Sequence, residues 1–240
     1  MGNKQVKQHL ENAQKTGVLK MSQLRLTEFP SALLSFPNPN VMRTLDISEN
    51  RFVEIPDAIS RFINLKHLNL SGNKLVLLSG SLGMLTKLET LNVMNNFLES
   101  LPVQLAQCKS LKQVILSNNQ IREFPVMLCG LKFLDLLDLS RNKITTIPDD
   151  VSSLQVTELN VNQNQISAVC ESIALCPKLK TFRIEENCLQ VNEALSRILK
   201  ESQICNLSVD GNLFNSKTLA ELDGYEAYMD RYTAARKKIC

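Results

Sequence analysis

Residues 65–75 read LKHLNLSGNKL, and this stretch decides the fold because its pattern recurs along the chain. The pattern L-x-x-L-x-L-x-x-N-x-L returns, with conservative exchanges, in seven further segments, whose asparagines are Asn50, Asn96, Asn119, Asn142, Asn164, Asn187 and Asn212. Counting Asn73 of the quoted stretch, successive asparagines lie 23, 23, 23, 23, 22, 23 and 25 residues apart. Such regular spacing over eight units predicts a solenoid of stacked coils.

The positions within one unit predict what each residue does. Leu45 and Ile47 are two residues apart, so they point to the same face of a short strand, the solenoid interior, while Asp46 points outward. Asn50 falls where the strand ends and the chain turns, and its amide can both donate and accept hydrogen bonds. We therefore expect the eight asparagines to form a structural ladder that pairs the turn backbones of neighbouring coils.

The remainder of each unit predicts a convex side without long helices. Segments such as IPDAISRF (residues 55–62) and LPVQLAQC (residues 101–108) carry a proline that favours loops or short 3₁₀ turns. The exception is residues 193–201, whose apolar residues recur with a helical period. A degenerate ninth unit, LKMSQLRLTEFP, precedes the eight, with Leu24 at the asparagine position.

Both ends of the chain predict helical caps. In residues 1–18, Val6, Leu10 and Ala13 share one helical face. In residues 215–240 we expect one helix, with inward positions Leu219, Leu222, Tyr225, Met229 and Tyr232. The predicted fold is an α/β solenoid, a horseshoe with a parallel concave sheet of about nine strands, repeats over residues 19–214, a loop or 3₁₀ convex side and helical caps at both ends.

The repeats resemble the intracellular, 23-residue class of the leucine-rich-repeat family over about residues 19–214. The flanking segments AQKTGV, IEENCL, SQIC and GYEAYMDRYTAARKK are similar to those of a lipid-anchored member of that class. The resemblance is specific for the fold and not for the function; it implies an intracellular repeat protein with a lipid anchor, here on Gly2, and it carries no catalytic residues.

Composition narrows the function classes. The chain has 240 residues, 44% hydrophobic residues and a net charge of +3, which is too mild for a nucleic-acid-binding surface. Its seven cysteines show no zinc spacing, so we expect no metal, and most of them are predicted to be small buried hydrophobes in a reducing compartment. The start is polar and lacks a signal peptide, which favours a cytoplasmic location.

The concave face holds the candidate protein-binding site. Met94, Ile115 and Leu136 are apolar residues at outward positions on three consecutive strands, where a small apolar cluster can anchor an interface. Asp135, Asp138 and Arg141 are candidates for its charged rim, and Arg183 beside Glu185 and Glu186 is a second candidate. The alternative is that these side chains are merely the solvated face of the sheet.

The predicted function is a non-enzymatic scaffold that binds a protein partner through the concave face and uses no cofactor. The alternative is a regulatory subunit of an enzyme, such as a phosphatase or a component of a small-GTPase pathway. Catalysis is disfavoured because the only histidines, His9 and His67, have no partner at catalytic spacing. Asp46 and Asp138 are also about 19 Å apart by strand spacing, too far for paired carboxylate chemistry.

The opening MGNKQVKQHL raises the question of a lipid anchor. Gly2 follows Met1 as N-myristoylation requires, but Val6 stands where the motif prefers Ser or Thr, so an ordinary start is the alternative. A single acyl chain binds membranes weakly and needs a second signal. The lysines of residues 1–20, namely Lys4, Lys7, Lys15 and Lys20, outnumber Glu11 and predict peripheral contact with an anionic membrane.

Overall fold

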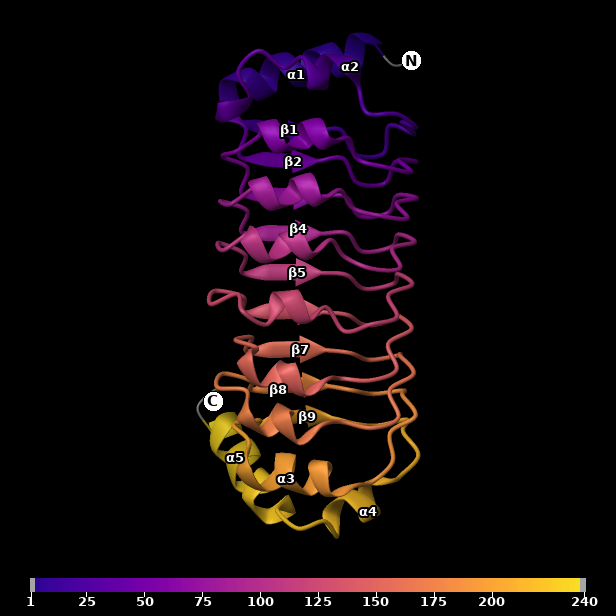
Figure 1. The fold of residues 1–240 in the computed structure, drawn as a ribbon, viewed down its shortest axis with the longest axis vertical. Helices are drawn as coiled ribbons and strands as arrows, with labels where there is room; N and C mark the ends of the chain where they lie inside the picture. Colours follow the sequence, from indigo (N-terminus) through magenta and orange to yellow (C-terminus); the bar gives the residue numbers. More distant parts are fainter. Residues whose placement is uncertain (1–2, 238–240) are drawn as a thin grey trace. The chain divides into compact units, whose positions relative to one another are not determined.

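The computed structural model describes residues 3–237, and the chain divides into two compact units, unit 1 (Met1–Gln120) and unit 2 (Ile121–Cys240). Unit 1 contains a parallel sheet whose strands pair in chain order: β1 (Val18–Lys20), β2 (Thr44–Asp46), β3 (His67–Asn69), β4 (Thr90–Asn92) and β5 (Gln113–Ile115). Unit 2 contains β6 (Leu136–Asp138), β7 (Glu158–Asn160), β8 (Thr181–Arg183) and β9 (Asn206–Ser208). Figure 1 shows these strands as arrows.

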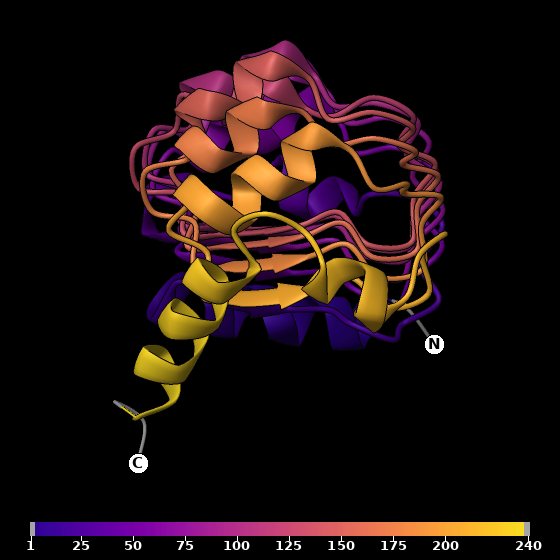
Figure 2. The same cartoon turned by 90° about the horizontal axis from the view of Figure 1, so that it is seen from below.

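The solenoid architecture predicted from the repeat is confirmed, with one strand in each coil. Within each unit, the middle residue of each strand pairs with the middle residue of the next, as in Leu45 with Leu68. Leu45 and Ile47 are fully buried while Asp46 is half-buried, as the two-residue period predicts. Seen along the stack in Figure 2, each coil has its strand on one side and its short helical segment on the other.

The convex segments are short because proline starts most of them. They are the 3₁₀ helices Asp57–Arg61, Gly80–Met84 and Val103–Gln107 in unit 1, and Val126–Leu128, Asp149–Ser153 and Glu171–Leu175 in unit 2. Four of the six follow a proline; Ser79 and Cys170 precede the other two. At Ser79 the hydroxyl accepts a hydrogen bond from the Ser81 amide, which helps to start that turn without proline.

The eight asparagines occupy the same position after each of β2–β9, and all of them are buried except Asn212, which is half-buried. The Asn96 amide donates to the carbonyl oxygens of Leu70 (3.1 Å) and Val93 (3.0 Å), and its oxygen accepts from the Leu75 amide at 3.0 Å. Leu70 and Leu75 belong to the preceding coil and Val93 to the same coil, so one side chain pairs two turns. The seven other asparagines also accept from a backbone amide of the preceding coil.

The residue before each asparagine adopts a left-handed backbone, a feature that the sequence analysis did not predict. Asn95 and Asn118, at φ of 57° and 55°, tolerate this conformation, but Arg141 (56°) and Glu186 (52°) do not favour it. The sequence signal was present, because glycine or asparagine occupies this position in the coils of Gly72, Asn95, Asn118 and Gly211. The neighbouring asparagine holds the turn closed where a less tolerant residue stands there.

Helices lie at both ends of the chain. The N-terminal helix α1 (Asn3–Thr16) buries Leu10 and Ala13 and is followed by the short α2 (Ser31–Leu34) and a 3₁₀ turn at Pro39–Val41. In unit 2, α3 (Glu193–Glu201) is the convex helix that the apolar period predicts. The amide of Leu195 donates to the Asn192 side chain, which caps the start of α3.

The predicted C-terminal helix is wrong in two respects. It is two helices, α4 (Ser216–Ala220) and α5 (Tyr225–Lys237), separated by a turn in which Gly224 has a φ of +92°. Its most buried side chain is Tyr228, at 7% exposure, whereas the predicted inward residues are only half-buried. The Tyr228 hydroxyl accepts a hydrogen bond from the Leu207 amide of β9. The hydrogen bond from the Leu207 amide, together with apolar contact, therefore determines which face of α5 points inward.

Candidate functional site

Each of β2–β5 presents two outward residues on the strand face of unit 1. They are Thr44 and Asp46, His67 and Asn69, Thr90 and Asn92, and Gln113 and Ile115. Ile115 is the apolar member of this set and is half-buried, as is Met94 in the turn after β4. Unit 1 thus places these two members of the predicted cluster on adjacent coils, less exposed than the sequence suggested.

The third residue of most strands has a structural task. The Oδ1 atoms of Asp46, Asn69 and Asn92 each accept a hydrogen bond from the backbone amide two residues further on, at 3.0 to 3.2 Å. This local bond ends the strand and starts the turn. Asp138 and Asn160 make the same bond in unit 2.

The strand face of unit 2 carries the other predicted residues. Leu136, the first residue of β6, is half-buried, with exposed Asp135 just before it and half-buried Asp138 two residues after it. Asp135 accepts a hydrogen bond from the Thr157 hydroxyl at 2.5 Å. Asp138 accepts from the Ser140 hydroxyl at 2.7 Å. Both proposed rim carboxylates are therefore already engaged by neighbouring hydroxyl groups.

The two predicted arginines are also tied to neighbouring coils. Arg141 donates through Nε to the Gln163 side chain at 2.5 Å, and Gln163 donates in turn to Glu186 at 2.8 Å. Arg183 lies 3.1 Å from Glu158 on the adjacent strand β7. These cross-coil pairs fix the side chains in place, so unit 2 offers an ordered polar surface around Leu136.

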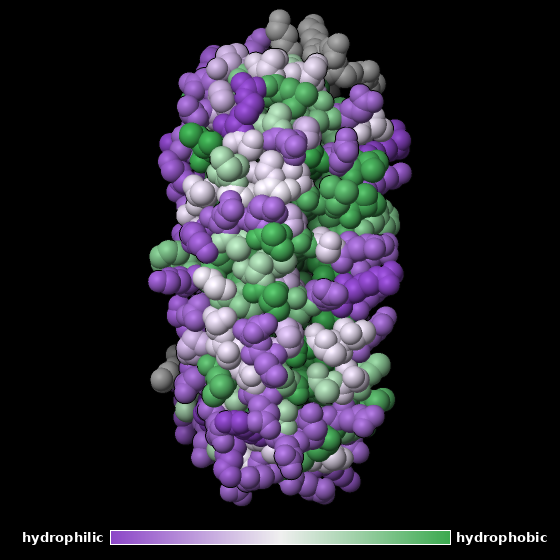
Figure 3. Space-filling model, in the orientation of Figure 1, coloured by the Kyte–Doolittle hydropathy of each residue, from purple (hydrophilic) through white to green (hydrophobic). Residues whose placement is uncertain are grey.

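Two surfaces of unit 1 went unnoticed in the sequence. The first is an apolar edge in the loops that follow β2–β4, formed by the exposed side chains Val53, Val76, Leu77 and Phe97, each between 47% and 57% exposed. Figure 3 shows apolar atoms gathered at the right-hand margin at the height of these loops. In the sequence these four residues belong to separate turns. They form one surface because the turns of successive coils stack on one another.

The second is a basic edge at the opposite ends of the same strands. It consists of the four residues that precede each of β2–β5, and its charged members are Arg43, Lys66, Lys87, Glu89, Lys109 and Lys112. Glu89 lies between Lys66 at 2.7 Å and Lys112 at 2.6 Å. Hydrogen bonds from Lys112 and Lys66 lower the pKa of Glu89 to about 2, so this carboxylate stays ionised.

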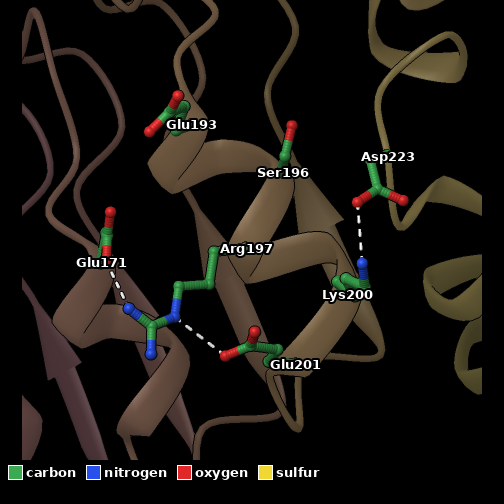
Figure 4. Close-up of a pocket in the computed structure, with 7 residues that line it drawn as sticks. All are labelled: Glu171, Glu193, Ser196, Arg197, Lys200, Glu201 and Asp223. Carbon is green, nitrogen blue, oxygen red and sulfur yellow. Dashed lines mark hydrogen bonds and ion pairs between the residues drawn. The ribbon is translucent and has the colours of Figure 1, made fainter.

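A hollow of about 510 Å³ on unit 2 is lined by charged residues of the convex side. Figure 4 shows Arg197 of α3 between Glu171 and Glu201, and Lys200 pointing to Asp223 in the turn before α5. The bond to Asp223 raises the pKa of Lys200, and the pKa of Asp223 falls in return. Both cations of the hollow are therefore paired, and these ion pairs connect α3 to the preceding convex segment and to the turn before α5.

The cysteines and histidines do not assemble into reactive chemistry among the residues that the structure describes. Burial raises the pKa of Cys108 and Cys129 to about 11 and that of Cys176 to about 12, which suppresses their thiolates. Of the six cysteines that the structure describes, these three are buried as predicted, Cys170 and Cys205 are half-buried, and Cys188 is exposed. No cluster of metal-ligating side chains occurs within residues 3–237.

The predicted membrane residues lie at the start of the chain. Gly2 falls outside the described residues, and so do the side chains of Lys4 and Lys7. Lys15, in the last turn of α1, and Lys20 are exposed. Between residues 3 and 237, no helix combines the length and the apolar character needed to cross a bilayer.

Comparisons with known proteins agree on the coil architecture. The leucine rich repeat family model matches residues 39–98 and 86–144. A plant ice-binding protein has a TM-score of 0.69 and 24% identity, covering 85% of this chain and 69% of its own. A repeat protein of Leptospira interrogans has a TM-score of 0.60 and 22% identity, covering 88% of this chain and 64% of its own.

An internalin of Listeria monocytogenes is similar at the same level, with a TM-score of 0.60 and 21% identity over 86% of this chain and 64% of its own. The chain therefore spans less than two thirds of the length of the Leptospira and Listeria proteins. At these identities the three structures establish the fold, and the surfaces described above must indicate the function.

Proposed function

Because this chain belongs to the leucine-rich-repeat family, we propose that it is a non-enzymatic scaffold that binds a protein partner through its strand face. The observation that carries the proposal is an apolar residue on each unit's strand face, Ile115 on β5 and Leu136 on β6, set among ordered polar side chains. A few apolar anchors surrounded by a polar rim supply most of the binding energy in many interfaces.

The surroundings of each anchor support this assignment. Around Ile115, Met94 adds a second half-buried apolar side chain from the adjacent coil, and the Asn118 amide donates to Asn95 at 2.9 Å. Around Leu136, the hydrogen bonds of Asp135 and Asp138 hold the rim in one conformation. An ordered surface loses little side-chain entropy when a partner binds.

Charge substitution tests the strand face. Ile115→Asp and Leu136→Asp should each weaken capture of the same partner by wild-type bait, with circular dichroism and melting temperature retained. Val103→Asp is the matched control, because Val103 is 65% exposed on the 3₁₀ side of unit 1. If both strand-face variants capture the partner as well as Val103→Asp does, the proposal fails. A stoichiometric enzyme among the captured proteins would favour the alternative of a regulatory subunit.

We further propose that the scaffold is cytoplasmic and is tethered to a membrane by a myristoyl group on Gly2. The position of the apolar edge supports this. Thr16 ends α1 one residue from the start of β1, and the 14 residues of α1 extend about 20 Å back across the coil. Helix α1 therefore begins on the side where the strands end, which is the side of the apolar edge (Figure 1).

Vesicle flotation of protein purified from cells with N-myristoyltransferase tests the tether. Wild type should float with phosphatidylserine vesicles, and Gly2→Ala should remain unbound. Leu77→Asp should weaken flotation, whereas Met84→Asp, a control at an exposed 3₁₀ residue, should not. An unmodified N-terminus in the intact mass of the cellular protein would refute the tether and leave the strand-face proposal standing.

A further inference from the structure

The basic edge of unit 1 concentrates positive charge that is not apparent from the net charge of the whole chain. Its five basic side chains, Arg43, Lys66, Lys87, Lys109 and Lys112, face one acidic side chain, Glu89. Four of the five are exposed and Lys66 is half-buried. The four strands that they precede span about 14 Å at the usual strand spacing. A single edge of a few coils thus carries a net charge of +4.

The matching edge of unit 2 is weaker, which makes the asymmetry specific to unit 1. The four residues before each of β6–β9 contain Lys132, Lys178 and Lys180 against Asp135. Lys180 is engaged by the Gln203 side chain at 3.2 Å, and Lys178 by the Lys132 carbonyl at 3.3 Å. The basic edge therefore does not follow from the repeat geometry, which both units share. It arises from the particular residues at these positions in unit 1.

Internal contacts organise the lysines of the basic edge. Glu89 draws Lys66 and Lys112 together from the coils on either side of its own. Lys87 donates to the Asn64 side chain at 2.6 Å. These surface contacts contribute little stability, but they restrict the side chains to one arrangement. The ammonium groups of Lys66, Lys87 and Lys112 are thus held by neighbouring coils and keep unused donor capacity, since each ammonium has three protons.

The adjoining strand face suits carboxylate groups. The first residues of β2–β5 are Thr44, His67, Thr90 and Gln113, each with a side chain that can donate a hydrogen bond. Asp46 is the acidic residue among the outward strand positions of unit 1, and its carboxylate already accepts from Ser48 at 2.6 Å. At the basic edge itself, Ile63 is 48% exposed and provides an apolar contact between the coils of Arg43 and Lys87.

We propose that the basic edge of unit 1 binds an acidic segment of a partner protein, laid along the stack with its carboxylates on the lysines. This inference deepens the proposed scaffold function and rests on it. The exposed Ile63 favours a peptide over a nucleic acid, and the four edge segments contain no aromatic ring for base stacking. A membrane is disfavoured because α1 begins on the opposite side of the coil.

Fluorescence anisotropy with the full-length protein tests this inference. The probe is a short fluorescein-labelled peptide in which glutamate alternates with serine and leucine. Wild type should bind it, and raising NaCl from about 0.05 to 0.5 M should weaken binding strongly through screening. The double variant Lys87→Glu/Lys109→Glu should bind about tenfold more weakly, because each replacement removes an attractive charge pair and adds a repulsive one. The unit 2 control, Lys178→Glu/Lys180→Glu, should bind like wild type.

Three outcomes would overturn the inference. They are no binding of the probe at low salt, equal loss in the unit 2 control, and tighter binding of phosphatidylserine vesicles or oligouridine with the same dependence on Lys87 and Lys109. The result is separable from the test of the strand face. Ile115→Asp should retain the acidic probe while losing the natural partner, so either proposal can fail alone.

Discussion

Replacing Asn96 by leucine tests the ladder at a position where every bonded group is known. Asn96 is 5% exposed, and its side chain bonds to Leu70, Val93, Met94 and Leu75. The three carbonyl oxygens keep other donors in the variant: Asn73 for Leu70, Asn119 for Val93 and the Gly72 amide for Met94. The group left without a bond is the buried amide of Leu75.

The expected cost follows from this accounting. An unpaired buried amide costs about 1–3 kcal/mol, and the lost bonds to the shared carbonyl groups add a smaller amount. We expect Asn96→Leu to lower the free energy of unfolding by about 3 kcal/mol. For a chain of this size each kcal/mol lowers the melting temperature by about 2–4 °C, so the melting temperature should fall by about 6–12 °C.

Urea denaturation and thermal melting, followed by circular dichroism, measure the effect. The control is Asn38→Leu, because Asn38 is exposed and makes no capping hydrogen bond through its side chain. It should change stability by no more than about 0.5 kcal/mol. If Asn96→Leu melts within 2 °C of wild type (about 1 kcal/mol), the pairing role that we assign to the ladder is refuted.

Three further predictions concern other parts of the chain. Tyr228→Phe removes the acceptor of the Leu207 amide and should cost about 1–2 kcal/mol in urea denaturation, whereas an unchanged midpoint would show that water replaces the hydroxyl. Iodoacetamide should label Cys188 before Cys176, whose pKa burial raises to about 12; equal rates by peptide mapping would contradict this. The pKa of Glu89 is about 2 in the folded protein and 4.5 in the unfolded chain, so its ionised carboxylate stabilises the fold above pH 4.5. This contribution to the free energy of unfolding should be lost as the pH falls from about 4.5 to 2, and the loss should be smaller in Glu89→Gln.

The repeat allowed most of the fold to be predicted, because the positions of leucine and asparagine carry the same physical task in every coil. The strands and the helix at residues 193–201 followed from periodicity, and the 3₁₀ convex side followed from the prolines in its segments. The C-terminal cap did not, because a single helix has no repeat to fix its face. Tyr228 points inward because its hydroxyl accepts a hydrogen bond from the Leu207 amide of β9. This is a tertiary contact, which the sequence pattern of the helix does not reveal.

The candidate site was less predictable because burial depends on neighbouring coils. Met94, Ile115 and Leu136 were expected to face water freely, yet all three are half-buried. Asp138 was expected to be a free rim charge, but it accepts from Ser140 two residues later. That bond was readable in principle, since Asp or Asn followed by Ser two residues on is a turn pattern.

The apolar edge and the basic edge could not be recognised from the repeat positions and the outward strand positions alone. Val53, Val76 and Leu77 belong to turns, where apolar residues carry no periodic signal, and they form an edge because successive coils stack in register. The lysines of the basic edge could not be recognised from the net charge of the whole chain, which is only +3. Listing charge separately for each edge of each coil would have revealed them.

Site-specific photocrosslinking tests the central claim, protein binding by the strand face, most directly. A photoreactive phenylalanine analogue replaces Ile115 on the strand face or Val103 on the 3₁₀ side, and crosslinked proteins are identified by mass spectrometry after irradiation of living cells. The scaffold account predicts one recurrent crosslinked protein from position 115 and none of it from position 103. The same protein crosslinked only from position 103 would contradict the account.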